Sequence, residues 1–451
     1  MPSLPTVRHR TRPALQPLGS GLGTMLSDWQ AFGRPAYRHY LVLALCQGLV
    51  LALSGTALII PLLLTLGLGP GASTLVASLA LIGPAAQLAV PSLLRRIDGN
   101  LRVLTLALAA LGETRGLWLG AVAVLAATGS IDRAWLVGAL VLGTAALGVF
   151  SGVSAANIQA WLSVVLPEQE RRFVAPRIVG LGLAVSAVLL VVVAVALDAA
   201  SRRYGIGAYG ACFVLGGVAG VVEVLVLGRL PRPGRVRVPR LGPATEPPPG
   251  WRRFVGIATL ASLGSGLAPY YSVFVISVLR ASASFAVALS ALTSAASVVA
   301  STVGAALLAH HSSSRLLRVG YASLGAGWVA ALASAPLNPF ALPWFVAVAL
   351  FISAGGSIVQ LAANERLFRL ASGPAIMAQQ GRFVGVTAAA TAAGQLASAL
   401  ALGLAPVGYP VFAALFVAAG GLRVIAAARL PVADAWANAT AVISIADLRR
   451  R

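Results

Sequence analysis

The chain has 451 residues, of which 58% are hydrophobic and only 10% are charged. Soluble domains carry about 25% charged residues, so this composition excludes a soluble globular protein and indicates a helical membrane protein with many spans. Lysine is absent, so the formal net charge of +21 comes from arginine, and the chain has neither a lysine-containing phosphate-binding loop nor a Schiff-base lysine.

Twelve apolar runs follow one another along the chain, and each is long enough to cross a bilayer core, which takes about 20 residues. The fold class that this pattern predicts is an all-α polytopic membrane protein with twelve transmembrane helices. The runs cover residues 40–66, 73–94, 101–127, 135–165, 173–197, 208–228, 254–279, 283–309, 315–334, 342–369, 381–404 and 408–428.

A segment rich in proline and arginine, residues 229–253, separates the first six runs from the last six and shows no apolar periodicity. We interpret it as a cytosolic linker between two six-helix bundles, residues 40–228 and 254–428. The two ends of the chain, residues 1–39 and 429–451, are expected to be cytosolic tails.

The distribution of arginine predicts the orientation of these spans. With the N-terminus placed in the cytoplasm, 28 of the 33 arginines fall in inner segments, the last of which is the C-terminal end from Arg423 onward. Four arginines fall outside, and only Arg115 falls within a span. Under the positive-inside rule, this distribution predicts a multi-pass protein with both termini in the cytoplasm. Richness in glycine, alanine and arginine without lysine indicates a bacterial source, so the expected location is the bacterial inner membrane. The basic charge therefore gives no reason to expect a nucleic acid partner.

The two halves share short sequence blocks at matching places. In each half an asparagine is followed ten residues later by a proline, and then by an Arg-Phe-Val triplet that begins the next span. Halves with an even number of spans and equal orientation are parallel repeats, an architecture of secondary transporters. The blocks are Asn157, Pro167 and 172–174 in the first half, and Asn364, Pro374 and 382–384 in the second.

With twelve spans, cytoplasmic termini and a long central linker, residues 35–430 resemble the major facilitator superfamily. The loop between spans two and three of that family usually reads Gly-x-x-x-Asp-Arg-x-Gly-Arg-Arg. The segment 94–102 reads Leu-Arg-Arg-Ile-Asp-Gly-Asn-Leu-Arg, so the resemblance gives Asp98 and Arg102 the parts of the acid and the closing base, in a broken order. The candidate loop and gate residues are Asp98, Arg102, Arg172, Glu365 and Arg382.

Two charged residues, Glu113 and Arg115, lie near the middle of the third span, where a charge costs about 2.5–3.5 kcal/mol on insertion scales. Because they are two residues apart, they point to opposite helix faces, and each needs its own partner or a wet cavity. Glu113 is the candidate proton-coupling carboxylate, with a structural contact between helices as the alternative. Arg115 is a candidate for attracting an anionic substrate. Glu223, near the inner end of span six, is expected to neutralise a nearby arginine such as Arg229.

Spans one, four, seven and ten line the central cavity in the resembled family, so their polar and aromatic residues are candidates for substrate contact. Asn157 with Trp161 and Gln360 with Asn364 are each four residues apart and share a helix face. Hydrogen bonding between helices is the alternative role for the asparagines and glutamines. Together with Arg115, the candidates are Gln47, Asn157, Trp161, Tyr270, Tyr271, Gln360 and Asn364.

The leading hypothesis for function is a secondary active transporter that works by alternating access and is coupled to protons or another ion. Sparse intramembrane charge favours export, by antiport, of a small amphipathic or apolar compound. An organic-anion transporter centred on Arg115 and a membrane scaffold or receptor that transports nothing are the alternatives.

We expect no enzyme activity, no cofactor and no metal site, because histidine, cysteine and carboxylates do not gather at one depth of the predicted bundle. The expected partners are the lipid bilayer, the small-molecule substrate and the coupling ion. The expected oligomeric state is a monomer.

Overall fold

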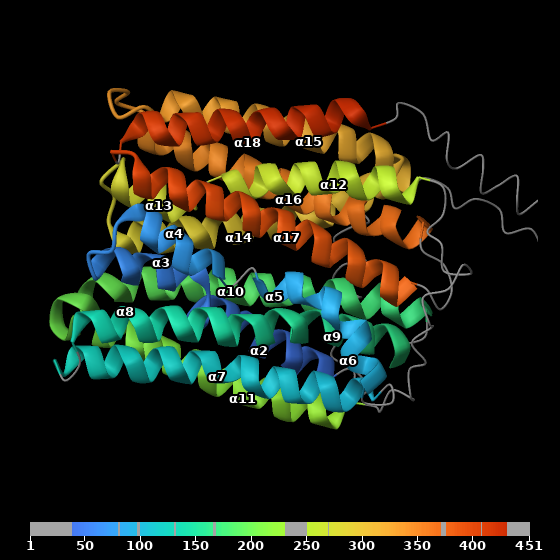
Figure 1. The fold of residues 1–451 in the computed structure, drawn as a ribbon, viewed down its shortest axis with the longest axis horizontal. Helices are drawn as coiled ribbons and strands as arrows, with labels where there is room; N and C mark the ends of the chain where they lie inside the picture. Colours follow the sequence, from blue (N-terminus) through green and yellow to red (C-terminus); the bar gives the residue numbers. More distant parts are fainter. Residues whose placement is uncertain are drawn as a thin grey trace, which may run out of the picture.

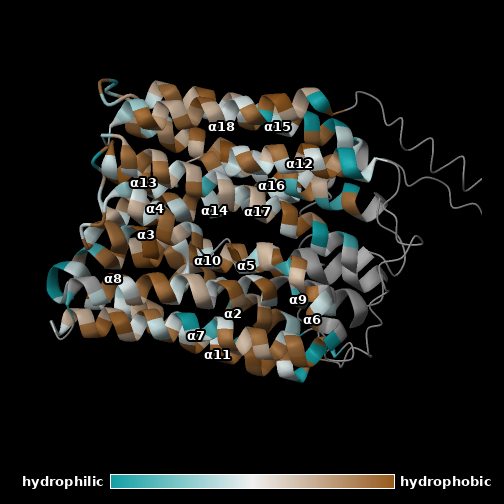
Figure 2. Cartoon of the chain, viewed as in Figure 1, coloured by the Kyte–Doolittle hydropathy of each residue, from teal (hydrophilic) through white to brown (hydrophobic). Residues whose placement is uncertain are grey.

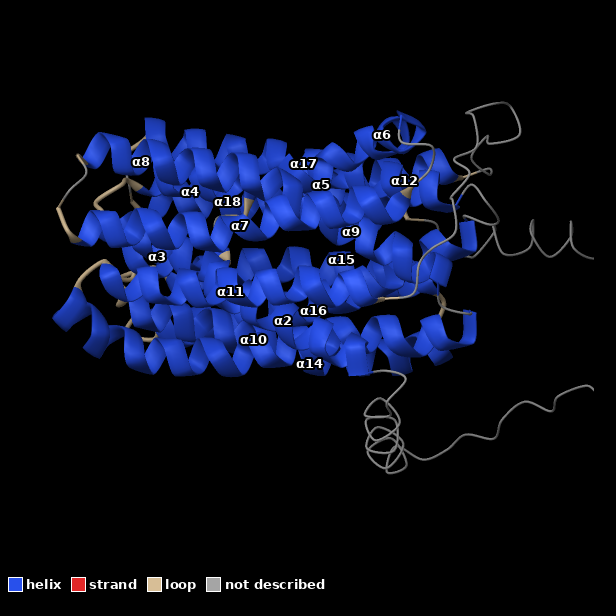
Figure 3. Cartoon of the chain, turned by 90° about the horizontal axis from the view of Figure 1, so that it is seen from below, coloured by secondary structure: helices blue, strands red, loops and turns tan. Residues whose placement is uncertain are grey.

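The fold is described from a computed structural model, over residues 38–79, 82–96, 100–129, 132–165, 168–230, 250–268, 270–370, 376–406 and 408–430. Within these residues every regular element is a helix (Figure 3). Twelve of the helical stretches are long and apolar enough to cross a membrane, which confirms the predicted fold class. The tails and most of the linker lie outside the described residues.

The first six spans begin with a broken helix, because α2 ends at Ser54 and α3 begins two residues later at Thr56. The second span is built from short pieces and the fourth contains a π-helical turn, which lets a helix shift its register without ending. The elements are α2 (Arg38–Ser54), α3 (Thr56–Thr65), α4 (Pro70–Leu79), α5 (Ile82–Ala85), η2 (Ala86–Ala89), α6 (Val90–Arg96), α7 (Leu101–Ala127), α8 (Arg133–Leu142), η3 (Gly143–Leu147), α9 (Gly148–Val165), α10 (Glu168–Tyr204) and α11 (Gly207–Arg229).

The last six spans repeat this plan, and their first member is also broken, between Leu267 and Tyr271. Hydropathy alone predicts one continuous span at each of the two breaks, because each break lies within a long run that is apolar overall. The elements are α12 (Trp251–Leu267), α13 (Tyr271–Ser277), α14 (Ala283–His310), α15 (Ser313–Ala330), η5 (Ala331–Ser334), α16 (Ala341–Leu370), α17 (Ile376–Leu404) and α18 (Tyr409–Arg429).

The same helix pairs pack together in both halves. In the first half α2 packs on α10 and α11, and α7 packs on α9 and α11. Their counterparts in the second half do the same: α12 packs on α17 and α18, and α15 packs on α16 and α18 (Figure 1). The two halves are therefore parallel six-helix repeats, as the shared sequence blocks predict.

The bundle has two distinct ends. We call the linker end the one at which α11 and α18 finish and α2 and α12 begin, on the right in Figure 1, and the other the far end. Hydrophobic residues cover most of the length of the helices, while hydrophilic residues lie mainly toward the two ends, the linker end above all (Figure 2). This separation is the pattern that a bilayer imposes on a spanning bundle.

The halves meet along α4 and α5 against α17, and along α10 against α14. At the far end α3 also packs on α13 and α14, and the hydrophobic cores interpenetrate there. Ile60 and Ala77 belong to the core of the second half, and Val287 and Ala291 belong to the core of the first half. The far end is therefore a packed contact between the repeats.

One hydrogen bond at the far end joins the two halves directly. The hydroxyl of Ser284 on α14 donates to Oδ2 of Asp198 on α10 at 2.7 Å. Ser282 pairs with the Ser284 hydroxyl at 2.8 Å, and its own oxygen caps α14 by accepting from the Phe285 amide. The cap and the contact between halves thus form one small network.

Candidate functional site

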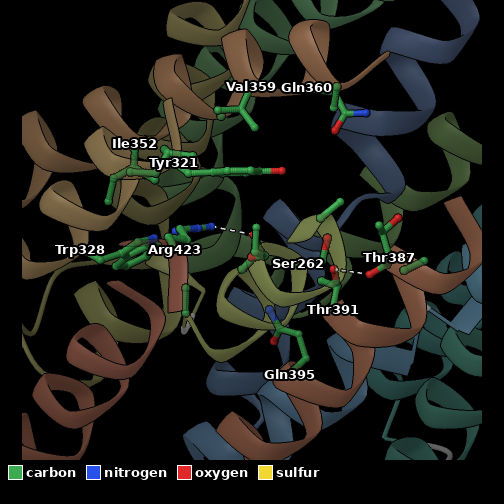
Figure 4. A pocket seen from close by; sticks show the side chains of 18 of the residues that line it. Ser262, Tyr321, Trp328, Ile352, Val359, Gln360, Thr387, Thr391, Gln395 and Arg423 are labelled. Atoms are coloured by element: carbon green, nitrogen blue, oxygen red, sulfur yellow. Dashed lines mark hydrogen bonds between the residues drawn. The ribbon is translucent and has the colours of Figure 1, made fainter. Parts of the chain in front are cut away.

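A cavity of about 580 Å³ lies inside the second half, between α12, α15, α16, α17 and α18 (Figure 4). Its walls combine aromatic rings with hydroxyl and amide groups. Tyr321 and Trp328 come from α15, Gln360 from α16, Thr391 and Gln395 from α17. Cavities of this size hold drug-sized molecules, and this one is lined mainly by apolar atoms with a few polar points.

Arg423 supplies the charged side chain among the residues that line this cavity. Its side chain is only 6% exposed and stands six residues before the end of α18 at Arg429. The Nη2 group donates to Oγ of Ser265 on α12 at 2.8 Å, and Nη1 has no hydrogen-bond partner among the described residues. Arg423 therefore joins Arg115 within the spans, which corrects its assignment to the inner group of arginines.

Aromatic rings hold the Arg423 guanidinium in place. It lies over the ring of Trp328, 5.8 Å from the ring centroid, in a cation–π arrangement. Trp328 in turn stacks on Phe416 at 5.4 Å and contacts Tyr271 at 5.8 Å between ring centroids. A guanidinium fixed by packing presents its remaining donors in one direction.

Three of the residues predicted to face a cavity line this one: Tyr270, Tyr271 and Gln360. Gln360 donates to Oδ1 of Asn364 at 3.3 Å, which agrees with their shared helix face, but Asn364 does not line the cavity. The others lie in the first half. Asn157 and Trp161 are buried there, 2% and 1% exposed.

A second polar cluster lies between α2, α7 and α11. Gln47 donates to Oε1 of Glu223 at 3.1 Å, and Glu223 is only 4% exposed. Glu113 on α7 lies against Gly220 of α11, one helical turn before Glu223. Glu223 thus has an amide partner and a neighbouring carboxyl group, in contrast to the expectation that it neutralises Arg229.

The Arg115 side chain reaches from α7 to the end of α2, and its charge interacts with that of Glu113. Its Nη2 donates to the backbone carbonyl of Ser54 at 2.5 Å, at the last residue of α2. That carbonyl has no intrahelical partner because the helix breaks at Gly55. Arg115 therefore caps the broken first span, and it does not line the cavity of the second half.

The predicted loop and gate residues are spread over the linker end. Arg102 donates to the Gly228 carbonyl at 2.6 Å and so links the start of α7 to the end of α11. Glu365 lies on α16, and Arg382 is exposed on α17. Asp98 lies outside the described residues, and Arg172 falls within α10 with an undescribed side chain.

The fold is shared with solved transporter structures at low sequence identity. A bacterial homologue of the iron transporter ferroportin, in an inward-facing state, gives a TM-score of 0.64 at 15% identity, over 88% of this chain and 98% of that one. The inward-open xylose transporter XylE from E. coli gives 0.64 at 14%, over 87% and 94%. The nucleoside transporter NupG gives 0.61 at 14%, over 86% and 96%.

The chain has the major facilitator fold. No protein-family model matches it, and no curated protein matches it either. Sequence identities of this size establish a shared fold and nothing more. The roles of the cavity and of the polar cluster must therefore be argued from the residues of this chain.

Several residues of the cavity are missing from the sequence prediction. Arg423 lies inside the predicted twelfth span, 408–428, and that position is the signal that could have identified it. Tyr321 and Trp328 give no such signal, because a lone aromatic residue in an apolar helix is most often a core residue. The packing of α15 on α18 brings them to Arg423.

Proposed function

We propose that this protein is a secondary active transporter that moves a small amphipathic compound by rocking its two six-helix halves about a central site. The observation that carries this proposal is the cavity in the second half, whose aromatic walls and few polar points suit an amphipathic ligand. The major facilitator fold supports the alternating-access mechanism.

In this proposal the coupling ion is the proton, and its site is the cluster of Glu113, Glu223 and Gln47. Two carboxyl groups that approach each other in an apolar interior repel strongly unless one of them carries a proton. Gln47 lies on α2, which packs on α10 and α11. A movement of α2 during rocking would change the environment of Glu223 through this hydrogen bond and release or take up the proton.

We propose export as the direction of transport and the linker end as the cytoplasmic end. The positive-inside distribution of arginine supports the orientation. An amphipathic compound partitions into the bilayer and crosses it without a carrier, so a coupled carrier is needed only to keep its cytoplasmic concentration below equilibrium. The packed contact of α3 with α13 and α14 at the far end is the closure expected on the outer side of an inward-facing state.

The alternatives rest on weaker features. An organic-anion site at Arg115 competes with the bond from that side chain to the Ser54 carbonyl. The role of a membrane scaffold or receptor does not explain why Arg423 is buried beside a cavity with an unpartnered Nη1 among the described residues. An enzyme would need a cluster of catalytic groups, and the cavity walls offer hydroxyl, amide and guanidinium groups without a carboxylate.

A cellular experiment tests the proposal. The wild type, Glu113→Gln and Asp132→Asn are expressed at matched levels in an efflux-deficient bacterium, and the intracellular content of a panel of amphipathic acids, amines and neutral compounds is measured. Asp132→Asn is the control, because that carboxylate is exposed at the start of α8. We expect the wild type and the control to deplete one compound class, and Glu113→Gln or a proton uncoupler to abolish this depletion. Contents equal to those with an empty vector would contradict export.

A further inference from the structure

We propose that Arg423 binds the anionic group of the transported compound, so that the substrate class is an amphipathic organic acid with an aromatic body. This inference rests on the proposed transport function and specifies its substrate. It also moves the anion site from Arg115 in the first half to the cavity of the second half.

The first step of the argument is the missing counter-charge. The ionisable groups that face Arg423 among the described residues are the phenols of Tyr271 and Tyr321, which are neutral at physiological pH. A cation buried in a bundle without a counter-ion is strongly unfavourable, and intramembrane charges of this kind mark substrate and ion pathways. An anionic ligand in the cavity would supply the missing charge.

The second step is the geometry of the donors. Ser265 accepts from Nη2, and its own hydroxyl donates to the Ala261 carbonyl at 3.1 Å, so Ser265 is oriented as an acceptor toward Arg423. Nη1 is buried and has no partner in the described part of the chain. A guanidinium can offer two parallel N–H groups to the two oxygens of a carboxylate, and the unpartnered Nη1 leaves this side chain with donors that the described residues do not use.

The third step is the shape and polarity of the rest of the cavity. Tyr270, Tyr271, Tyr321 and Trp328 line it beside Arg423, as Figure 4 shows for Tyr321 and Trp328. Rings of this kind stack on an aromatic ligand body. Gln395 on the facing helix α17 is 5% exposed and its Oε1 has no partner among the described residues, so it offers one more polar contact. An aromatic carboxylic acid satisfies the guanidinium and the rings together.

This substrate class also fits the proposed direction. The neutral form of a weak organic acid crosses a bilayer, and near neutral pH it loses its proton and becomes a membrane-impermeant anion. Such an anion accumulates in the cytoplasm and leaves only through a carrier. Exchange of one outgoing anion for one incoming proton moves two positive charges inward, so both the membrane potential and the proton gradient drive export.

A pair of isosteric probes tests the proposal by binding alone. Purified full-length protein in detergent is titrated at neutral pH with 2-naphthoate and with its neutral amide, 2-naphthamide, by isothermal titration calorimetry. We expect the wild type to bind the anion about 10- to 100-fold more tightly than the amide, the range for a charged hydrogen bond. Equal affinities for the two probes, or no binding of either, would overturn the inference.

Variants then assign the preference to Arg423. Arg423→Gln should bind both probes equally weakly, whereas Arg429→Gln, which makes the same change at an exposed site on the same helix, should keep the preference. If Arg423→Gln does not give a monodisperse protein, Ser265→Ala tests the same site by removing the hydroxyl that orients the guanidinium. Its naphthoate affinity should fall while its naphthamide affinity stays unchanged. A naphthoate preference that survives these changes contradicts the proposal.

The binding assay separates this inference from the proposed function. Arg423-dependent naphthoate binding without depletion of any compound from cells would refute transport and leave the anion site standing. Depletion of amines or neutral compounds by a protein that does not distinguish naphthoate from naphthamide would support transport and refute the anion site.

Discussion

Glu223 and Arg423 occupy the same place in the two repeats. Each stands six residues before the arginine that ends the last helix of its half, Arg229 in α11 and Arg429 in α18. Each is buried, and each bonds a polar side chain of the first helix of its half: Gln47 for the acid and Ser265 for the base. The repeated fold thus holds an acid and a base at one position.

The surroundings of the two residues differ as much as their charges do. Glu223 has a second carboxyl group nearby, that of Glu113, and does not line the cavity of the second half. Arg423 has aromatic rings around it and a cavity beside it. We infer that the two halves have kept a common backbone plan while one carries the proton site and the other the substrate site. The predictions that follow test this division.

Reversing the charge in the second half should have the largest effect. Arg423→Glu places an acid at both repeated positions. Naphthoate binding should fall below detection, and the cation 2-naphthylmethylammonium should bind in its place, because the aromatic walls are unchanged and favour a cation. Titration calorimetry with both probes checks this. Retained naphthoate binding would show that the charge at this position does not select the ligand.

Arg115→Gln should leave naphthoate binding unchanged and reduce stability. The guanidinium bonds the Ser54 carbonyl at the break of the first span, and a hydrogen bond from a charged donor contributes about 1.5–3 kcal/mol. A lower apparent Tm with an intact preference for naphthoate over naphthamide is therefore expected. Loss of that preference would instead favour an anion site centred on Arg115.

Gly220→Ala should displace the Glu113 side chain from its place beside the Glu223 helix. A Cβ at Gly220 would collide with the Glu113 carboxylate, and overpacking of this kind costs about 1–3 kcal/mol. Gly228→Ala on the same helix is the matched control, since its Cβ meets nothing within 4 Å. In Gly220→Ala, both the Tm in detergent and the uncoupler sensitivity of export should change. In Gly228→Ala, neither should change. Identical results for the two variants would contradict the close packing of Glu113 against Gly220.

Asp198→Asn should have the smallest effect. The Ser284 hydroxyl keeps an acceptor but loses a charged one, so the contact between the halves weakens by about 1 kcal/mol. The expected result is a larger population with separated far ends, measured as a longer distance between spin labels at positions 135 and 337. Both positions are exposed and lie in opposite halves. Asp132→Asn is the control, and the same distance distribution in both variants would rule out a latch at Asp198.

The sequence predicts the fold well because many independent sequence features point to the same architecture. Twelve apolar runs, one linker and repeated blocks such as those at Asn157 and Asn364 each describe a whole helix or loop, and small errors in their limits do not change the architecture. Hydropathy predicts neither the break after Ser54 nor the one after Leu267, since it does not report where backbone hydrogen bonds stop. In the seventh span, Gly264, Gly266 and Pro269 do indicate a place where the helix can bend.

The site is harder to predict because it depends on contacts between helices far apart in the chain. Tyr270, Tyr271 and Gln360 line the cavity and are predicted from the spans that they occupy. Arg423 is assigned to an inner segment by the arginine census, since a basic residue near a helix end resembles an interfacial one. Only the packing of α18 on α12 and α15 reveals that it is buried beside a cavity.

The most direct test of the division between the halves is an electrical one. Proteoliposomes on a solid-supported membrane receive a jump in 2-naphthoate concentration, and diffusion of the neutral acid gives no current because it carries no charge. We predict a naphthoate-dependent current in the wild type that grows with a proton gradient, a current in Glu223→Gln that no longer responds to that gradient, and no current in Arg423→Gln. A full current in Arg423→Gln, or an unchanged gradient response in Glu223→Gln, would contradict the account.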